Sequence, residues 1–135
     1  MRRSLPLLCL PLSALALSAC GSTVSTSAFK GSEHEVAETI SNLQSDATTG
    51  EEKKICGDDL AAAVVSRLGG KKACETAIKH QLAEINNLQV SVRSVKLGSD
   101  SSTATAQVTS IHEGRTKPST LALVKEGGKW KVSGL

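Results

Sequence analysis

Aromatic residues are almost absent from this chain of 135 residues, which has no tyrosine and only Phe29 and Trp130 as aromatic side chains. A pocket without aromatic side chains has few groups that give a small ligand affinity. The chain also lacks a glycine-rich phosphate loop, a nucleophile elbow and paired carboxylates of the kind that bind metals. We therefore predict no catalytic, cofactor-binding or metal-binding residues and no enzymatic activity.

Charge of one sign is not in large excess either, because 16 lysines and arginines stand against 13 acidic residues and give a net charge of +3. Two of the basic residues, Arg2 and Arg3, precede Cys20 and no acidic residue does, so residues 20–135 have a net charge of only +1. Binding to nucleic acid needs a basic stripe. We therefore expect no nucleic-acid partner.

The first residues have the three regions of a secretory signal peptide. Arg2 and Arg3 are the charged start, residues 5–17 are the apolar run, and Ser18-Ala19 is the small-residue cleavage site. The apolar run is too short and too interrupted by proline to span a membrane stably. Residues 1–19 are therefore predicted to be a signal peptide.

The tetrapeptide Leu17-Ser18-Ala19-Cys20 resembles the cleavage box of bacterial lipoproteins. The resemblance implies that Cys20 receives a diacylglyceryl thioether and that the new amino terminus can also be acylated, for example with palmitate. Two or three acyl chains at ~0.8 kcal/mol per buried methylene anchor a protein strongly. The alternatives are cleavage nearby by an ordinary signal peptidase and a free thiol at Cys20. We expect an extracytoplasmic protein anchored in the cell membrane through Cys20, with residues 20–31 as a flexible tether rich in small polar residues.

Two cysteines remain for the folded domain once Cys9 leaves with the signal peptide and Cys20 takes lipid. An oxidising compartment favours a disulfide between Cys56 and Cys74. The alternatives are a metal site and a redox pair. A zinc site needs about four ligands, and His80 is the only nearby third candidate. A redox pair usually has two residues between its cysteines. We therefore predict a structural disulfide.

Three helices are predicted from the helical spacing of apolar residues. Ser32 and Glu35 form a capping box at the start of the first helix, which ends at Thr48-Thr49-Gly50. After a charged link at residues 51–54, Asp58 or Asp59 caps the second helix, and Gly69-Gly70 stops it. The third helix carries Cys74 and ends near Asn86-Asn87. The apolar faces comprise Val36, Ile40, Leu43 and Ala47 in the first helix, Leu60, Val64, Val65 and Leu68 in the second, and Cys74, Ile78, Leu82 and Ile85 in the third.

Four strands are predicted after residue 87, where apolar residues begin to alternate. The first strand changes phase near Arg93-Ser94, which indicates a bulge or bend. The second covers residues 103–111, and residues 114–118 form the next turn. Residues 120–125 and 130–135 form a hairpin around Gly127-Gly128, a pair that suits a tight primed turn. Residues 32–135 are thus predicted to be one α+β domain, with three N-terminal helices packed on a curved four-strand antiparallel meander.

Two short segments carry a family resemblance. One is Gly127-Gly128-Lys129-Trp130-Lys131-Val132 at the end of the chain, and the other runs from Cys56-Gly57-Asp58-Asp59-Leu60 to Gly70-Lys71-Lys72-Ala73-Cys74. Together with helices followed by curling strands, they look like the nuclear transport factor 2-like (SnoaL-like) superfamily and its small lipid-anchored members. The resemblance implies a cone-shaped fold, which in this superfamily hosts enzymes, binding modules and scaffolds.

Single polar and aromatic residues are expected to be structural. His34, His80 and His112 are predicted to lie at the surface, and Asp58 and Asp59 are explained as helix caps. Trp130 could belong to an interfacial patch with Lys125, Lys129 and Lys131. Alternation instead places Trp130 and Val132 in the core with the lysines in solvent, and we prefer this interpretation.

Two functions remain compatible with the sequence. The first is a non-enzymatic accessory or protein-interaction module of the bacterial envelope, and the second is a carrier or sensor of a small apolar ligand held in the cone. Small side chains at Thr103, Ala104, Thr105 and Ala106 could leave room for a ligand or let helices pack closely. We favour the accessory function with a protein partner, because an aromatic-poor pocket offers little affinity.

Overall fold

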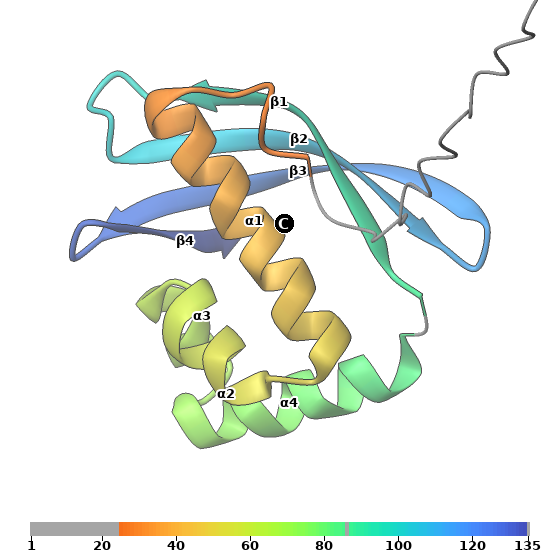
Figure 1. The fold of residues 1–135 in the computed structure, drawn as a ribbon. Helices are drawn as coiled ribbons and strands as arrows, with labels where there is room; N and C mark the ends of the chain where they lie inside the picture. The colour runs from red at the N-terminus through yellow and green to blue at the C-terminus, as the bar shows by residue number, and fades with distance from the viewer. Residues whose placement is uncertain (1–24, 86, 135) are drawn as a thin grey trace, which may run out of the picture.

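The computed structural model describes residues 25–85 and 87–134, so the predicted signal peptide and Cys20 lie outside the described residues. Helices precede strands along the chain (Figure 1). The helical elements are α1 (Gly31–Thr49), α2 (Glu52–Lys54), the π-helical turn η1 (Ile55–Asp59), α3 (Ala62–Arg67) and α4 (Lys71–Glu84). The strands are β1 (Gln89–Leu97), β2 (Thr103–His112), β3 (Arg115–Glu126) and β4 (Lys129–Gly134).

The four strands form one antiparallel sheet in the order β1-β2-β3-β4, which is the predicted meander. α1 crosses one face of this curved sheet, and α2, α3 and α4 gather around the C-terminal half of α1 (Figure 1). The core lies between α1 and the sheet and consists of Val36, Ile40, Ala104, Ala106, Val108, Leu121, Leu123, Trp130 and Val132. The prediction that Trp130 and Val132 face the core is confirmed, since each is 4% exposed.

The local features of the sheet agree with the predictions. The register of β1 against β2 shifts between Val92 and Ser94, so the bulge lies where the apolar pattern changes phase. In the β3–β4 hairpin, Gly127 and Gly128 have φ angles of 57° and 80°. Both angles lie in the left-handed region, where glycine has no steric penalty, and such angles suit a primed turn.

Strand β3 begins earlier than predicted, because Arg115 to Pro118 belong to the strand and not to a turn. Pro118 pairs with Thr109 of β2, whereas β4 pairs with β3 only from Ala122 onward. At Pro118 the other side of β3 is therefore an open edge. Proline is tolerated there because no neighbouring strand needs its missing N–H.

The prediction of a capping box at the start of the first helix is wrong. α1 begins at Gly31, before Ser32, and its N-cap residue Lys30 makes no side-chain capping hydrogen bond. Glu35 has a different partner, because its Oε2 accepts a hydrogen bond of 3.1 Å from Nε1 of Trp130. The Glu35 side chain thus bonds to Trp130 of β4 and does not form the capping bond that the local pattern predicted.

The number of helices is also corrected, because the described residues contain four α-helices and not three. The charged link at residues 51–54 contains α2, and η1 occupies the start of the predicted second helix. Leu60 is extended, with φ −92° and ψ 140°, and pairs with Val132 in a parallel β-bridge. This bridge to β4 ends the helical turn, so α3 is shortened to residues 62–67.

Several side chains of the predicted helices consequently lie elsewhere. Asp58 and Asp59 cap no helix, because the N-cap residue of α3 is Ala61 and makes no side-chain capping bond. Leu68 and Ile85 are 39% and 37% exposed, although the pattern predicted both on inner faces. Each of them follows the last residue of its helix, α3 or α4, where the helical face no longer continues.

The disulfide between Cys56 and Cys74 is present, with a Cα–Cα distance of 6.1 Å. It joins η1 to α4, and both half-cystines are buried. Among the described residues, no helix combines the length and apolar character needed to cross a membrane.

Candidate functional site

The structure describes two of the three predicted site residues. Cys56 and Cys74 form the predicted disulfide, whereas Cys20 lies outside the described residues. The three histidines lie on different elements, His34 on α1, His80 on α4 and His112 at the end of β2. In residues 25–85 and 87–134, no three His, Cys, Asp or Glu side chains form a group that could hold a metal ion.

Two of the histidines are less exposed than predicted. Nδ1 of His34 lies 3.0 Å from the carbonyl oxygen of Thr26, and its Nε2 lies 3.1 Å from Oε1 of Glu38. His34 thus ties the residues before α1 to the helix. Nε2 of His112 is buried and has no hydrogen-bond partner. Only His80 is fully at the surface, as expected.

A small inner cavity of about 240 Å³ lies between α1 and the sheet. Its walls are mostly apolar and include Ile40 and Leu43 of α1 and Val108 and Leu121 of the sheet. Ligand pockets usually measure about 300–1,000 Å³, so this cavity lies just below that range.

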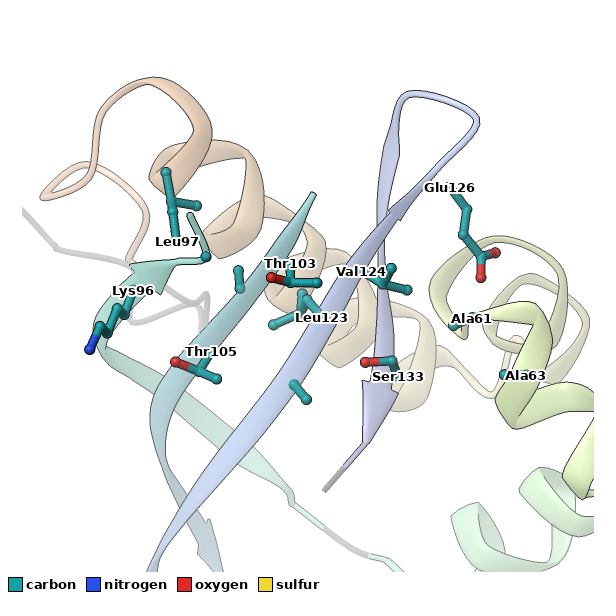
Figure 2. Close-up of a pocket in the computed structure, with 13 residues that line it drawn as sticks. Ala61, Ala63, Lys96, Leu97, Thr103, Thr105, Leu123, Val124, Glu126 and Ser133 are labelled. Carbon is teal, nitrogen blue, oxygen red and sulfur yellow. The ribbon is translucent and has the colours of Figure 1, made fainter. Parts of the chain in front are cut away.

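A wider groove of about 670 Å³ lies near β4 on the other face of the sheet, the face that α1 does not cover (Figure 2). Thr105 pairs with Lys96 on β1 and with Ala122 on β3, so these three side chains form a row on one face. Successive side chains of a strand alternate between faces, and the neighbours Ala104 and Leu123 face the core. The row therefore points away from α1. Short side chains leave the backbone of this face accessible.

One border of the groove is formed by the start of α3 and the residue before it. Ala61 and Ala63 line the groove there, as Figure 2 shows. The N–H of Ala61 donates to the carbonyl oxygen of Val132 at 2.9 Å, and the N–H of Ala62 donates to the carboxylate of Glu126 at 3.2 Å. These bonds cover the edge of β4 and fix the border of the groove.

A third hollow, of about 310 Å³, lies between α1, η1 and the β3–β4 turn, and we call it the acidic hollow. Its lining includes the carboxylates of Glu35, Glu38, Asp58 and Asp59, together with Lys129 and Trp130. Nζ of Lys125 lies 3.4 Å from Oε2 of Glu35 and 5.5 Å from the centre of the Trp130 ring. Trp130 thus contacts both members of the Lys125–Glu35 ion pair.

Asp59 is the unusual residue of the acidic hollow, because it is only 5% exposed and its Oδ2 receives no hydrogen bond. Burial raises the pKa of Asp59 to about 7, with further increases from the charge of Asp46, a hydrogen bond with the Asp46 carboxyl group, and the charge of Asp58. Lys131 acts in the opposite direction. The Asp46–Asp59 hydrogen bond needs a proton on one carboxyl group, so two ionised groups would leave Asp59 without a donor.

The sequence singled out Glu35, Asp58 and Asp59, but only as capping residues. Adjacent aspartates after a cysteine fit a helix start, and no local signal shows that Asp59 meets Asp46 from α1. That contact depends on how the disulfide and the Leu60–Val132 bridge place η1.

Comparison with solved structures identifies the fold. A protein described as an NTF2-like transpeptidase from Campylobacter jejuni superposes with a TM-score of 0.51 at 16% identity, over 71% of this chain and 94% of that one. A variant of an NTF2 design, named Rd1NTF2, gives 0.50 at 17% identity, over 73% and 91%. The chain has an NTF2-like cone fold. No protein-family model and no curated protein matches the sequence. At these identities the likeness concerns the fold alone, and the predicted cone is confirmed.

The raised pKa of Asp59 predicts an unusual pH dependence of stability. In the folded protein Asp59 keeps its proton up to about pH 7, whereas the unfolded chain loses it near 3.8. The folded state therefore binds more protons between these values, and this contribution to stability falls as pH rises from about 4 to 7. Between pH 5 and pH 8 the loss is at most about 2–3 kcal/mol, since one pKa unit corresponds to about 1.36 kcal/mol.

Urea unfolding of the disulfide-bonded protein at pH 5 and pH 8 measures this effect. The Asp59→Asn variant should lack the loss, because asparagine resembles the protonated acid. Asp58→Asn, which changes the exposed neighbour, should keep most of it. Equal pH dependence of the wild type and Asp59→Asn would contradict the assignment.

Proposed function

We propose that this protein is a lipid-anchored accessory module of the bacterial cell envelope, which binds a protein partner and catalyses no reaction. The observation that carries the proposal is the wide groove on the face of the sheet that α1 does not cover. At about 670 Å³ the groove has more than twice the volume of the inner cavity, which measures about 240 Å³. Recognition on the outer face is therefore favoured over enclosure of a ligand.

The groove has the properties of a surface for an extended protein segment. Thr103, Thr105 and Ala122 are short, so a partner chain can approach the sheet closely. Lys96 lies at one side of the groove and Glu126 at another, which gives polar groups at the border of a mostly apolar floor. A polar rim around a less polar centre is the usual arrangement in protein interfaces.

The anchor is proposed from the signal-like residues that precede the described part of the chain. A tether over residues 20–31 would hold the domain on the order of 20 Å from the lipid headgroups. The tether ends close to the domain, because Phe29 is half-buried and His34 contacts the carbonyl oxygen of Thr26. The domain would then lie within reach of partners near the membrane surface.

A second function is supported by the inner cavity. An engineered cavity of about 150 Å³ is known to bind benzene, so about 240 Å³ suffices for a small apolar molecule. Ser110 and Ser119 line one part of the cavity and supply hydroxyl groups for a polar end. The transpeptidase name of the C. jejuni protein does not favour an enzyme here, since a fold does not determine its chemistry.

Lipid attachment is tested by the Cys20→Ser variant expressed in the native host. Because the thioether forms on the sulfur of Cys20, the variant should lose labelling by an alkyne fatty acid and leave the membrane fraction. Cys9→Ser, which changes a residue of the predicted signal peptide, is the matched control and should keep both properties. A Cys20→Ser protein that remains labelled and membrane-bound would disprove the lipoprotein assignment.

Partner binding is tested by placing a photo-crosslinking amino acid at Thr105, in the groove, and at Gln81, on the exposed side of α4. Irradiation of intact cells should give a discrete protein adduct from Thr105 and none from Gln81, and mass spectrometry should identify one partner. No protein adduct from Thr105, or the same adducts from both positions, would contradict the proposal. A small apolar molecule that copurifies without any adduct would favour the second function.

A further inference from the structure

The acidic hollow is separate from the sheet groove but borders the same hairpin. Glu126 lines the groove, whereas Gly128 and Trp130 line the hollow. On the other side, Ala61 lines the groove and Asp59 the hollow. The groove and the acidic hollow therefore share the β3–β4 hairpin and the segment from η1 to α3 as borders.

Two of the four carboxylates of the hollow already have internal partners. Glu35 accepts hydrogen bonds from Trp130 and Lys125, and Glu38 pairs with His34. Asp58 and Asp59 differ from them, because within residues 25–85 and 87–134 no lysine, arginine or histidine nitrogen lies within ion-pair distance of either group. The positive groups nearby are Lys129 on the lining and Lys131, whose Nζ donates to the carbonyl oxygen of Gly57 at 3.0 Å.

Asp59 provides a second, independent observation that indicates a ligand. Its side chain is 5% exposed, it belongs to the lining of the hollow, and its Oδ2 has no hydrogen-bond donor. A buried ionised carboxylate without a donor is unfavourable, so the group must either keep a proton or receive a cation. Asp46 of α1 and Asp58 repel a negative charge on Asp59, while Lys131 of β4 attracts it only partly. Lys54 contacts Asp46 at 3.7 Å and not Asp59.

The wall of the hollow also suits an organic cation. Trp130 contributes an aromatic ring, and its contact with Lys125 shows that an ammonium group is held beside this ring and the Glu35 carboxylate. The carboxylates are distributed around the hollow and form no group that could hold a metal ion in the described part of the chain. A lysine or arginine side chain, with an apolar stem and several N–H donors, fits such a site better than a bare ion does.

We propose that the acidic hollow receives a lysine or arginine side chain of the partner protein, and that Asp58 and Asp59 bind its cationic head beside Trp130. The proposal rests on the proposed function and specifies the chemistry of the partner. The incoming N–H groups supply a donor to Oδ2 of Asp59, and they replace the proton that this carboxyl group shares with Asp46. Binding is thus expected to release a proton and to weaken at low pH.

The single tryptophan gives a direct readout. The indole N–H of Trp130 produces one cross-peak in a ¹H–¹⁵N correlation spectrum, and the ring lines the hollow. The lipidated protein in detergent micelles is titrated with a blocked alanine–lysine–alanine tripeptide. The matched control peptide carries norleucine in place of lysine, which keeps the stem and removes the charge.

The lysine peptide should shift the indole cross-peak saturably, and the norleucine peptide should not. Asp59→Asn should weaken binding roughly tenfold, the usual effect of losing one hydrogen bond to a charged group. Asp58→Asn, at an exposed position, provides a second variant whose folding is not at risk and should also weaken binding. Glu84→Gln on α4 is the control and should leave binding unchanged. Binding should be weaker at pH 5 than at pH 8, and Asp59→Asn should remove this difference.

Three results would overturn the inference. The first is an indole cross-peak that is shifted neither by the lysine peptide nor by the same peptide with arginine in place of lysine. The second is equal binding of butylamine, which would make the hollow a site for free amines and not for a protein side chain. The third is a stronger response to Mg²⁺ or Ca²⁺ than to the peptides. The crosslink at Thr105 tests the proposed function separately. If a partner is crosslinked there and any of these three results is obtained, only the inference about the acidic hollow fails.

Discussion

The packing of Trp130 between α1 and the sheet is the constraint on which the rest of the structure depends. The chain has no tyrosine and only one other aromatic residue, so this indole is the largest side chain available to the core. It belongs to the same core cluster as Val36 and Ile40 of α1, and its N–H donates to Glu35, the residue directly before Val36. Because one side chain both fills the core and bonds to α1, it determines how the helix crosses the sheet.

The second constraint is the short segment from η1 to α3. The disulfide attaches Cys56 to α4, and the Leu60–Val132 bridge attaches the end of η1 to β4. Between these two attachments Asp59 is held beside Asp46 in a buried position. The same segment provides one border of the sheet groove and one wall of the acidic hollow. Both proposed contact regions therefore share a wall that covalent and backbone links hold in place.

Predictions from the sequence succeeded where the signal is local. Alternation located β1 and β2, the phase change located the bulge at Val92 and Ser94, and Gly127-Gly128 located the hairpin turn. Alternation also placed Trp130 in the core correctly. Each of these features follows from the two-residue period of strands or from the φ angles that glycine permits.

Predictions failed where contacts between distant residues override local preference. Glu35 fits a capping box, but its carboxylate is taken by Trp130. Asp58 and Asp59 fit helix caps, but the bridge from Leu60 to β4 replaces the expected helix start with a π-helical turn. The candidate site at Asp59 could not be predicted, because its burial and its neighbour Asp46 exist only in the folded chain.

Chemical denaturation of Trp130 variants, followed by circular dichroism, tests the central claim most directly. Trp130→Ala should lower the free energy of unfolding by about 3–5 kcal/mol, because burial energy is lost and a cavity remains. Trp130→Phe, which keeps a ring but loses the N–H to Glu35, should lie between alanine and wild type. The wild-type indole should be shielded from an aqueous quencher. Unchanged stability of Trp130→Ala, together with red and readily quenched wild-type emission, would contradict the account.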